Sequence, residues 1–401
     1  MRNRTPRRRP GRPTRACKPP SRGRFVWLGV VVLAGILLAL IQPQTASARP
    51  GTATRAAPPR PVVLAYYYIW FQKSSWKHAK TDYPLLGRYS SNESWVMRRH
   101  IEWAKQAGIN GFVVSWKSTS RLNARLARMV QVAASQHFKL AIIYEGLNYH
   151  RHPLPVSEIT HDLAQFSRWY GNEPVFKIFE KPMVIVSGSW AFSLADMKAI
   201  ARSAGDHLLV LGSEKNVAGI QRLAGTVAGD AYYWSSVDPF KPEPVAKLRA
   251  MATEIHRQRG LWIAPAAVGF DARLLGGHRV IKRNGGATLR ESWAEALASS
   301  PDAVGIISWN EFSENSYIEP SWKYGWSALR TVTDLAQAPQ PTVQGFDSNA
   351  PAGHTDGIPA MVAVACLTGL VIAAVMIVAR REGRPRPHGP ADHTGHPPRI
   401  R

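Results

Sequence analysis

Eight short apolar runs alternate with helical patterns between residues 62 and 335, and this alternation constrains the fold more than any other feature of the chain. The runs have the length and the β-branched or aromatic content of buried strands. They cover residues 62–68, 111–116, 139–145, 183–187, 208–212, 230–234, 261–266 and 304–309. The helical patterns that follow them cover residues 93–106, 121–135, 157–170, 194–203, 217–223, 245–258, 288–299 and 326–335.

Eight strand and helix pairs over this length predict an α/β fold, a (β/α)8 TIM barrel in a single domain over residues 62–336. An open doubly wound sheet is the alternative. A glycine-rich, phosphate-binding turn after the first strand would favour that alternative, and the sequence has no such turn there.

The basic residues are concentrated in the two tails. The chain has 401 residues and a net charge of +24, and residues 1–24 contain ten Lys or Arg and no acidic residue. Residues 380–401 form a second basic tail. Because the central region keeps only a moderate excess of positive charge, no nucleic-acid partner is expected.

Two uncharged apolar stretches predict attachment to a membrane. Residues 25–42 are long enough for a transmembrane or signal-anchor segment, and a small-x-small pattern ending at Ala48 makes a cleaved signal peptide the alternative. Residues 358–379 predict a transmembrane helix, and the arginines that follow them predict a cytoplasmic flank. Both basic tails are then cytoplasmic. Linkers at 43–61 and 337–357 hold the central domain outside the cell membrane.

Aromatic and acidic side chains recur where the predicted strands end. In parallel α/β folds these ends meet at one rim, where loops bind ligands. Sugar rings stack on aromatic side chains, and sugar hydroxyls bond to carboxylates, so the pattern predicts a carbohydrate site. Packing inside the barrel layers is the alternative for each aromatic residue taken alone. The candidate substrate contacts are Tyr68, Trp70, Trp116, Tyr144, Glu145, Tyr233 and Asp271.

The last predicted strand leads directly into Trp309, Asn310, Glu311, Glu314 and Glu319. Glycoside hydrolysis needs two carboxyl groups at one bond, one protonated and one ionised. Glu311 and Glu314 are the predicted catalytic pair, because two acids in one turn split their protonation. Trp309, Asn310 and Glu319 are further candidate sugar contacts, although Glu319 could simply begin the next segment. A solvated acidic loop is the alternative for the whole stretch.

The sequence lacks the motifs of zinc hydrolases, serine hydrolases and nucleotide-binding enzymes. The chain has no His-Glu-x-x-His, no paired cysteines, no Gly-x-Ser-x-Gly and no Walker-type loop, so neither a metal nor another cofactor is expected. His150 and His152 could bind a metal, but their loop setting beside Arg151 favours a solvated surface or a substrate loop.

Several of these motifs together resemble glycoside hydrolase family 99, the endo-α-mannosidase and endo-α-mannanase family, and its bacterial relatives. They are Tyr-Tyr-Tyr-Ile-Trp at 66–70, residues 100–116, Tyr-Glu at 144–145, Gly-Phe-Asp at 269–271, and Trp-Asn-Glu-Phe-Ser-Glu at 309–314 with Ile-Glu-Pro at 318–320. The resemblance implies a (β/α)8 barrel and a retaining, metal-independent reaction. It implies that Glu311 takes the proton of the sugar 2-hydroxyl, and that Glu314 acts as acid and then as base. Tyr68 and Glu145 match substrate-holding positions.

The acidic stretch departs from the family pattern in one part. The family usually continues its motif as Trp-His-Glu-Gly, whereas this chain has Phe-Ser-Glu-Asn at 312–315. Both acids are kept, and the change bears on mannose specificity. Related bacterial domains also occur in proteins of surface-polysaccharide synthesis.

Two functions follow from the sequence. The first is a membrane-anchored, extracytoplasmic, endo-acting glycosidase with an α-mannoside-type substrate in cell-envelope polysaccharide or glycoconjugate. The second is a non-catalytic glycan-binding or polysaccharide-assembly protein on the same barrel, because a fold alone does not establish activity.

Overall fold

The computed structural model describes residues 61–336. Eight parallel strands form one sheet in the order β5-β4-β3-β2-β1-β10-β7-β6. Their bounds are β1 Val62–Tyr68, β2 Gly111–Trp116, β3 Lys139–Glu145, β4 Met183–Ser187, β5 Leu209–Leu211, β6 Gly229–Ala231, β7 Leu261–Ala267 and β10 Ala303–Ile307. The first strand pairs with β2 on one side and with β10 on the other. This circular pairing excludes the open sheet that was the alternative.

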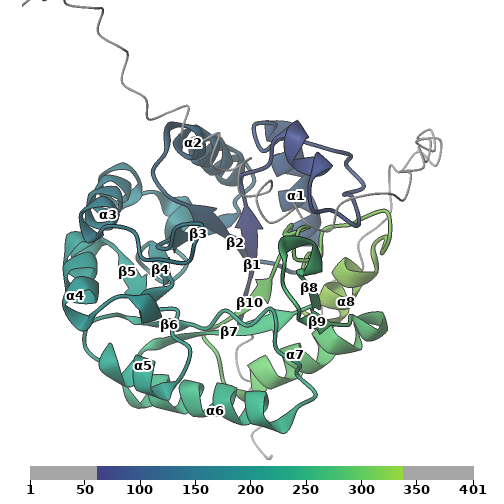
Figure 1. The fold of residues 1–401 in the computed structure, drawn as a ribbon. Coiled ribbons are helices and arrows are strands. Elements are labelled where there is room, and N and C mark those ends of the chain that lie inside the picture. Colours follow the sequence, from purple (N-terminus) through teal and green to yellow (C-terminus); the bar gives the residue numbers. More distant parts are fainter. Residues whose placement is uncertain (1–60, 337–401) are drawn as a thin grey trace, which may run out of the picture. The chain divides into compact units, whose positions relative to one another are not determined.

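The sheet closes between β5 and β6. The amide of Ala228 donates to the carbonyl of Val210 at 2.8 Å, and the amide of Ala231 donates to the carbonyl of Gly212 at 2.9 Å. Helices ring the barrel on the outside, one after each strand (Figure 1). Their bounds are α1 Ser94–Gln106, α2 Ser120–Ser135, α3 Val156–Tyr170, α4 Leu194–Ser203, α5 Val217–Arg222, α6 Pro242–Arg257, α7 Ala287–Ala298 and α8 Ser327–Leu335. The predicted TIM barrel is confirmed over these residues.

Local signals explain where the helices begin. Thr119 accepts a hydrogen bond from the amide of Leu122 at the start of α2, and Ser193 forms a capping box with Asp196 at the start of α4. Such caps satisfy amide groups that have no partner within the first helical turn. The sequence therefore encodes the strand-to-helix turns as well as the strands.

Alternation along each strand separates two apolar layers. Side chains such as Tyr66, Val113 and Ile143 fill the barrel interior, and their immediate neighbours pack against the helices. Gly305 makes room for the ring of Tyr66, because a Cβ atom at this position would lie 3.0 Å from that ring. Side chains on the inner face of each strand thus fill the barrel, and those on the outer face pack against helices. This alternation decides which predicted site residues reach the rim.

Three strands are shorter than predicted at their carboxyl ends, and the fifth, which ends at Leu211, is shorter by one residue. The sixth ends at Ala231, because Tyr232 and Trp234 turn outward and join the layer beneath the helices. The last ends at Ile307, because the chain from residue 308 hydrogen-bonds to itself. A small antiparallel hairpin, β8 Phe270–Asp271 with β9 Val280–Ile281, lies beside the end of β7 in the foreground of Figure 1.

Within residues 61–336, no helix has the length and apolar character needed to cross a membrane. The predicted membrane segments at 25–42 and 358–379 lie outside the described residues, as do the predicted tails and almost all of both linkers.

Candidate active site

The acidic loop, residues 308–320, follows β10 and folds back on itself. The amide of Ser308 donates to the carbonyl of Ser316 at 2.6 Å, and the amide of Ile318 donates to the carbonyl of Ser308 at 2.9 Å. The amide of Trp309 donates to the carbonyl of Tyr66 on β1 at 2.7 Å. These bonds fix the loop at the carboxyl end of the barrel, and with it the positions of Glu311 and Glu314.

Asn310 and Glu319 anchor the acidic loop through hydrogen bonds to buried residues. Asn310 forms two hydrogen bonds with the backbone of Tyr68, accepting from its amide at 2.8 Å and donating to its carbonyl at 3.0 Å. Glu319 accepts a hydrogen bond from Tyr89 at 2.9 Å and lies 2.9 Å from His100 Nε2. Both side chains are buried, so the structure gives them loop-anchoring contacts in place of the predicted contact with sugar.

Glu311 is a buried carboxyl with several groups that favour its ionised form. Its Oε1 atom accepts a hydrogen bond from the amide of Ser313 at 2.9 Å, and its own amide donates to Ser308 Oγ. Burial raises the pKa of Glu311, and the charge of Lys80 is the strongest effect that opposes this rise. Lys80 is held in place by a 2.6 Å hydrogen bond to Ser313 Oγ.

Glu314, three residues further on, differs from Glu311 in the neighbouring charge that most affects its pKa. Burial raises the pKa of Glu314 to about 8, and the neighbouring charge of Glu311 adds to the rise. Arg151 opposes it and Glu145 adds to it. At neutral pH one member of the pair therefore holds a proton, and Glu311, with its cation and amides, is the better carboxylate.

Other predicted contacts gather around the two acids. The hydroxyl groups of Tyr68 and Tyr233 lie 2.6 Å apart, and the charges of both Glu311 and Glu314 raise the pKa of each tyrosine after burial itself. Glu145 accepts a hydrogen bond from Ser115 at 2.7 Å, and burial raises its pKa. Four separate strand ends thus supply one group of side chains.

Trp70 lies beside this group with 42% of its surface exposed. Its ring stacks on Tyr68 with the ring centroids 4.4 Å apart. An exposed indole on a rigid aromatic neighbour suits the apolar face of a sugar ring.

Three predicted contacts face away from the rim. Trp116, Tyr144 and Trp309 are fully buried in the layer between the strands and the helices. Trp116 donates a hydrogen bond to Asn123 on α2, and Tyr144 donates one to Asp162 on α3. The prediction that they contact sugar does not match these positions. The reason is alternation: Ser115 and Glu145 face the barrel axis, so their neighbours face outward.

Asp271 lies on the β8–β9 hairpin and is only partly buried. Its carboxylate is paired with Arg273 at 2.7 and 2.9 Å, and this pairing lowers the pKa of Asp271. Its amide donates to the carbonyl of Glu314 at 2.7 Å. The hairpin therefore supports the acidic loop through its backbone.

Sequence analysis missed Lys80, which is separated from Ser313 by 233 positions. Lys80 lies in the long connection between β1 and α1, where no periodic pattern assigns a direction to a side chain. Ser115 could have been found, because it is two positions from Val113 on the inner face of β2. No group of three or more His, Cys, Asp or Glu that could hold a metal ion occurs in residues 61–336.

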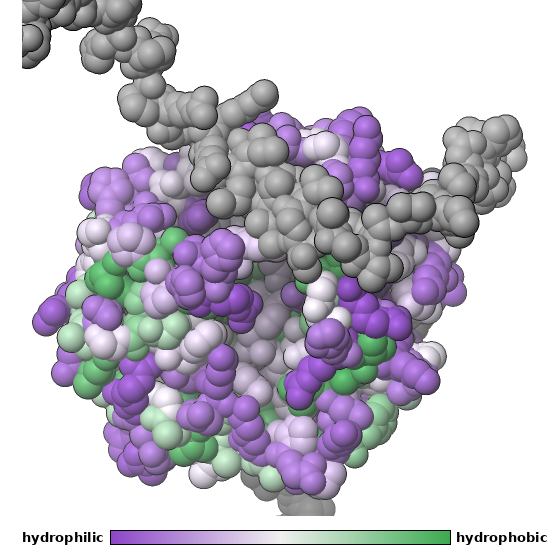
Figure 2. Space-filling view, in the orientation of Figure 1, coloured by the Kyte–Doolittle hydropathy of each residue, from purple (hydrophilic) through white to green (hydrophobic). Residues whose placement is uncertain are grey.

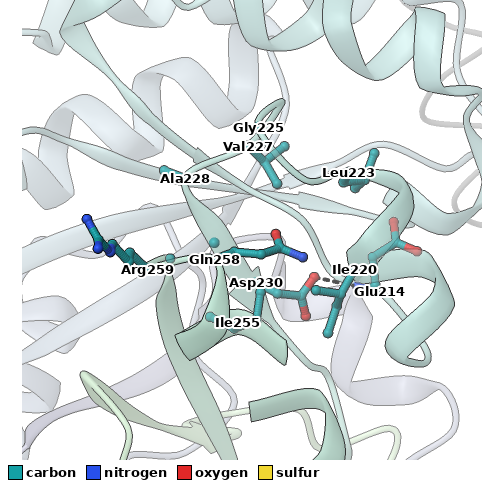
Figure 3. Close-up of a pocket in the computed structure, with 12 residues that line it drawn as sticks. Glu214, Ile220, Leu223, Gly225, Val227, Ala228, Asp230, Ile255, Gln258 and Arg259 are labelled. Atoms are coloured by element: carbon teal, nitrogen blue, oxygen red, sulfur yellow. Dashed lines mark hydrogen bonds between the residues drawn. The ribbon is translucent and has the colours of Figure 1, made fainter. Parts of the chain in front are cut away.

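A separate acidic cavity lies between β6, α5 and α6 (Figure 3). It has a volume of about 140 Å³ and is lined partly by Ala228 and Gly260, which precede β6 and β7. Asp230 and Gln258 point into it in Figure 3. Glu214 accepts hydrogen bonds from Ser189 at 2.7 Å and from Arg222 at 3.0 Å. This cavity is therefore on the helix side of the strands, away from the acidic loop.

A closed barrel with two neighbouring carboxyl groups and aromatic side chains at its carboxyl rim is an arrangement typical of glycoside hydrolases. Comparison with known proteins agrees. The model of glycosyl hydrolase family 71 matches residues 85–341, which is more than half of the chain. The chain belongs to glycosyl hydrolase family 71.

Solved structures show the same fold. A family 99 endo-α-mannosidase from Bacteroides thetaiotaomicron, in complex with Bis-Tris propane, superposes with a TM-score of 0.62 at 19% identity, covering 69% of this chain and 97% of that one. A glycoside hydrolase-like protein superposes with a TM-score of 0.53 at 15% identity, covering 69% and 93%. No match was found among curated proteins. The resemblance to family 99 and its relatives is confirmed at the level of the fold, and the family membership supports a glycosidase.

Proposed function

We propose that the protein is a membrane-anchored, extracytoplasmic, endo-acting glycosidase that cleaves α-mannoside-type bonds in cell-envelope polysaccharide or glycoconjugate. One observation carries the catalytic part: two carboxyl groups of one loop, the buried Glu311 and the half-buried Glu314, lie together at the rim, and the pKa of Glu314 is raised to about 8. The membrane part depends on the apolar stretches 25–42 and 358–379.

The first chemical step uses the two acids in different protonation states. The carboxylate of Glu311 takes the proton of the sugar 2-hydroxyl, and O2 forms a bond to C1. As the bond from C1 to the leaving oxygen breaks, Glu314 donates its proton to that oxygen. The raised pKa of Glu314 supports its role as the acid, and Lys80 with the amide of Ser313 supports Glu311 as the base.

The second step reverses both proton transfers. Ionised Glu314 takes a proton from water, and the water oxygen forms a bond to C1 while the bond from C1 to O2 breaks. Glu311 then returns its proton to O2. Two inversions at C1 give retention of configuration, and each acid returns to its starting state. We propose no metal or other cofactor for this reaction.

The remaining rim residues bind substrate in this proposal. Trp70 stacks on a sugar ring through its exposed face, and Tyr68, Tyr233 and Glu145 bond to sugar hydroxyls. The hydroxyls of Tyr68 and Tyr233 bond to each other, and Glu145 accepts from Ser115. They are therefore free to exchange their present partners for substrate.

The test is product release by the full-length protein from a panel of α-mannans and isolated envelope glycans, followed by mass spectrometry. Glu311→Gln and Glu314→Gln should each lower turnover by about 10²- to 10⁴-fold, as expected for loss of a general acid or base. Glu295→Gln, in α7, is the matched control and should keep activity, because Glu295 pairs with Arg249 of α6 in the helical layer. Binding of a glycan without release by any of these proteins would show the alternative, a non-catalytic glycan-binding or assembly protein.

A further inference from the structure

An exposed aromatic pair lies next to the acidic loop. Trp322, two residues past the end of that loop, has 59% of its surface exposed, the largest fraction among the large apolar side chains of residues 61–336. Its ring lies 5.6 Å from the ring of Tyr83, measured between the centroids, with the ring planes tilted by 55°. Tyr83 comes from the long connection between β1 and α1. We call Trp322 and Tyr83 the aromatic platform.

Contacts with neighbouring residues hold the aromatic platform in place. A single exposed tryptophan is common on protein surfaces, so its exposure alone assigns no role. Here the amide of Trp322 donates to the carbonyl of Tyr83 at 2.9 Å, and the guanidinium of Arg88 lies 4.4 Å from the centre of the Tyr83 ring. The amide of Lys323 donates to Asp82 Oδ1 at 2.9 Å. Both platform residues are therefore positioned before a ligand arrives, which lowers the entropy lost on binding.

The segment 80–85 runs beside the acidic loop and connects the platform to the acids. Three hydrogen bonds join the two segments: Lys80 to Ser313 at 2.6 Å, Thr81 to Asn315 at 2.7 Å, and Leu85 to Pro320 at 2.8 Å. The amide of Ser313 in turn donates to Glu311 Oε1 at 2.9 Å. Tyr83 is three residues past Lys80, and three residues of chain span at most about 11 Å. The platform therefore lies on the same rim as the acids.

The rim offers two separate stacking surfaces to one glycan chain. Trp70 is a second exposed indole, and it follows β1, whereas Trp322 follows β10. The strands β1 and β10 are paired, so the two indoles are carried by the loops of neighbouring strands. In Figure 2 this face of the barrel is hollowed at its centre, and hydrophilic and hydrophobic side chains border the hollow. The border gives room for sugar units on both sides of the bond that is cut.

We infer that the aromatic platform is a distal subsite, which binds a sugar ring of the glycan chain outside the bond that is cut. The inference rests on the proposed function, because it takes Glu311 and Glu314 as the point of cleavage. The flat face of an indole suits the C–H face of a pyranose. Binding energy from a remote sugar unit is available only to a long chain, so the platform makes the protein prefer long glycans to short ones.

The test measures cleavage by the full-length protein of α-mannooligosaccharides graded in length from dimers to decamers. Trp322→Ala should lower kcat/KM about three- to tenfold for the longest oligosaccharides and change it less than about twofold for the shortest one that is cleaved. The loss should be mainly in KM, because the platform is remote from the reacting atoms. Trp322→Phe keeps a flat ring and should restore part of the loss.

The matched control is an exposed tryptophan at the other end of the barrel. Trp169 has 46% of its surface exposed and lies in the last turn of α3, and helices here run opposite to the strands. Trp169→Ala should leave kcat/KM unchanged at every length. A second readout is calorimetric binding of the same oligosaccharides to Glu314→Gln, in which the proposed cleavage is blocked, with and without Trp322→Ala. Thermal unfolding checks that each variant is folded.

The outcomes separate the subsite from the proposed function. An equal loss at every length, no loss at any length, or the same loss in Trp169→Ala would overturn the subsite. Cleavage that depends on Glu314 and not on Trp322 would leave the glycosidase intact and remove only the subsite. Binding of long chains that depends on Trp322, with no cleavage by the unmutated protein, would establish the subsite and refute the glycosidase. Neither cleavage nor binding at any length would overturn both.

Discussion

The barrel contains two pairs of acids that look alike in sequence and differ in their surroundings. Glu311 and Glu314 lie on a loop at the carboxyl rim, and Glu214 and Asp230 line a cavity behind β6. Burial raises the pKa of Glu314 and of Asp230 alike. A raised pKa therefore does not by itself separate a reactive acid from a structural one.

The two pairs of acids differ in the groups that surround their carboxyl oxygens. Glu214 already has Ser189 and Arg222 as partners. Asp230 Oδ2 accepts from the amide of Glu214 at 2.8 Å, while the buried Oδ1 of Asp230 has no hydrogen-bond partner among residues 61–336. At the rim, Glu314 has another carboxyl as its nearest strong influence after burial. Two carboxyl groups that share one proton beside an open face can do acid–base chemistry, whereas a carboxylate neutralised by arginine stabilises the fold.

The largest expected effect compares amide substitutions in the two groups. Glu314→Gln should lower kcat by about 10²- to 10⁴-fold, because an amide has no proton to donate at the leaving oxygen. Asp230→Asn should keep kcat within about twofold, because it is remote from the acidic loop. Steady-state kinetics on the cleaved glycan measures both. Similar losses in the two variants would abolish the distinction.

The second largest effect is a loss of folding stability, and it should occur only when Glu214 or Asp230 is changed. Glu214→Ala leaves Ser189 and the partly exposed Arg222 without their acceptor, and should cost about 2–3 kcal/mol in the free energy of unfolding. Urea unfolding measures it. Glu314→Ala provides the contrast: it should cost little or even stabilise, because it removes a carboxyl from a site where burial and Glu311 oppose its charge.

The pH dependence of stability sharpens the contrast at Asp230. Its pKa is raised in the folded protein, while the unfolded chain releases this proton at about pH 3.9. The stabilisation is therefore fully present below about pH 4 and is lost as the pH rises toward the folded pKa. Asp230→Asn has no such loss, so its stability relative to the unmutated protein should grow by up to about 1.4 kcal/mol per pH unit across this range. Parallel curves of unfolding free energy against pH would contradict the assignment.

A smaller effect is expected from the cation beside Glu311. Lys80→Met removes the charge that lowers the pKa of Glu311, so this carboxyl should be protonated at higher pH. The acidic limb of the kcat/KM profile should move to higher pH, with a loss of about three- to tenfold at pH 5 and a smaller loss near neutrality. The basic limb, set by Glu314 near pH 8, should stay near its original position. A uniform loss at every pH would indicate a structural role for Lys80.

The smallest effect is expected at the β8–β9 hairpin. Asp271→Asn breaks a surface pair with Arg273, so unfolding free energy should change by about 0–1 kcal/mol and kcat should be nearly constant. Glycan affinity decides whether the sequence-based prediction of a sugar contact at Asp271 holds. A loss of more than about fivefold in affinity, with stability unchanged, would support that contact.

The sequence predicted the barrel well because each strand and helix is locally encoded. Apolar runs of the right length, separated by helical patterns and capping residues such as Thr119 and Ser193, leave few alternatives for the backbone. It also predicted that Glu145, Glu311 and Glu314 would lie at one rim, because parallel strands bring their carboxyl ends together. Trp116 and Tyr144 were misassigned because proximity to a strand end was given more weight than the direction of the side chain.

The sequence by itself determined the order of strands and helices, the acidic loop and the identity of its two acids, since these depend on neighbours close along the chain. Only the tertiary structure decided which side chains share a space. It brought Lys80 to Ser313, where its charge acts on Glu311, and it joined Tyr68 to Tyr233. Closure of the barrel is the physical reason, because it places loops far apart in sequence around one rim, where charge and burial then set the pKa of each acid.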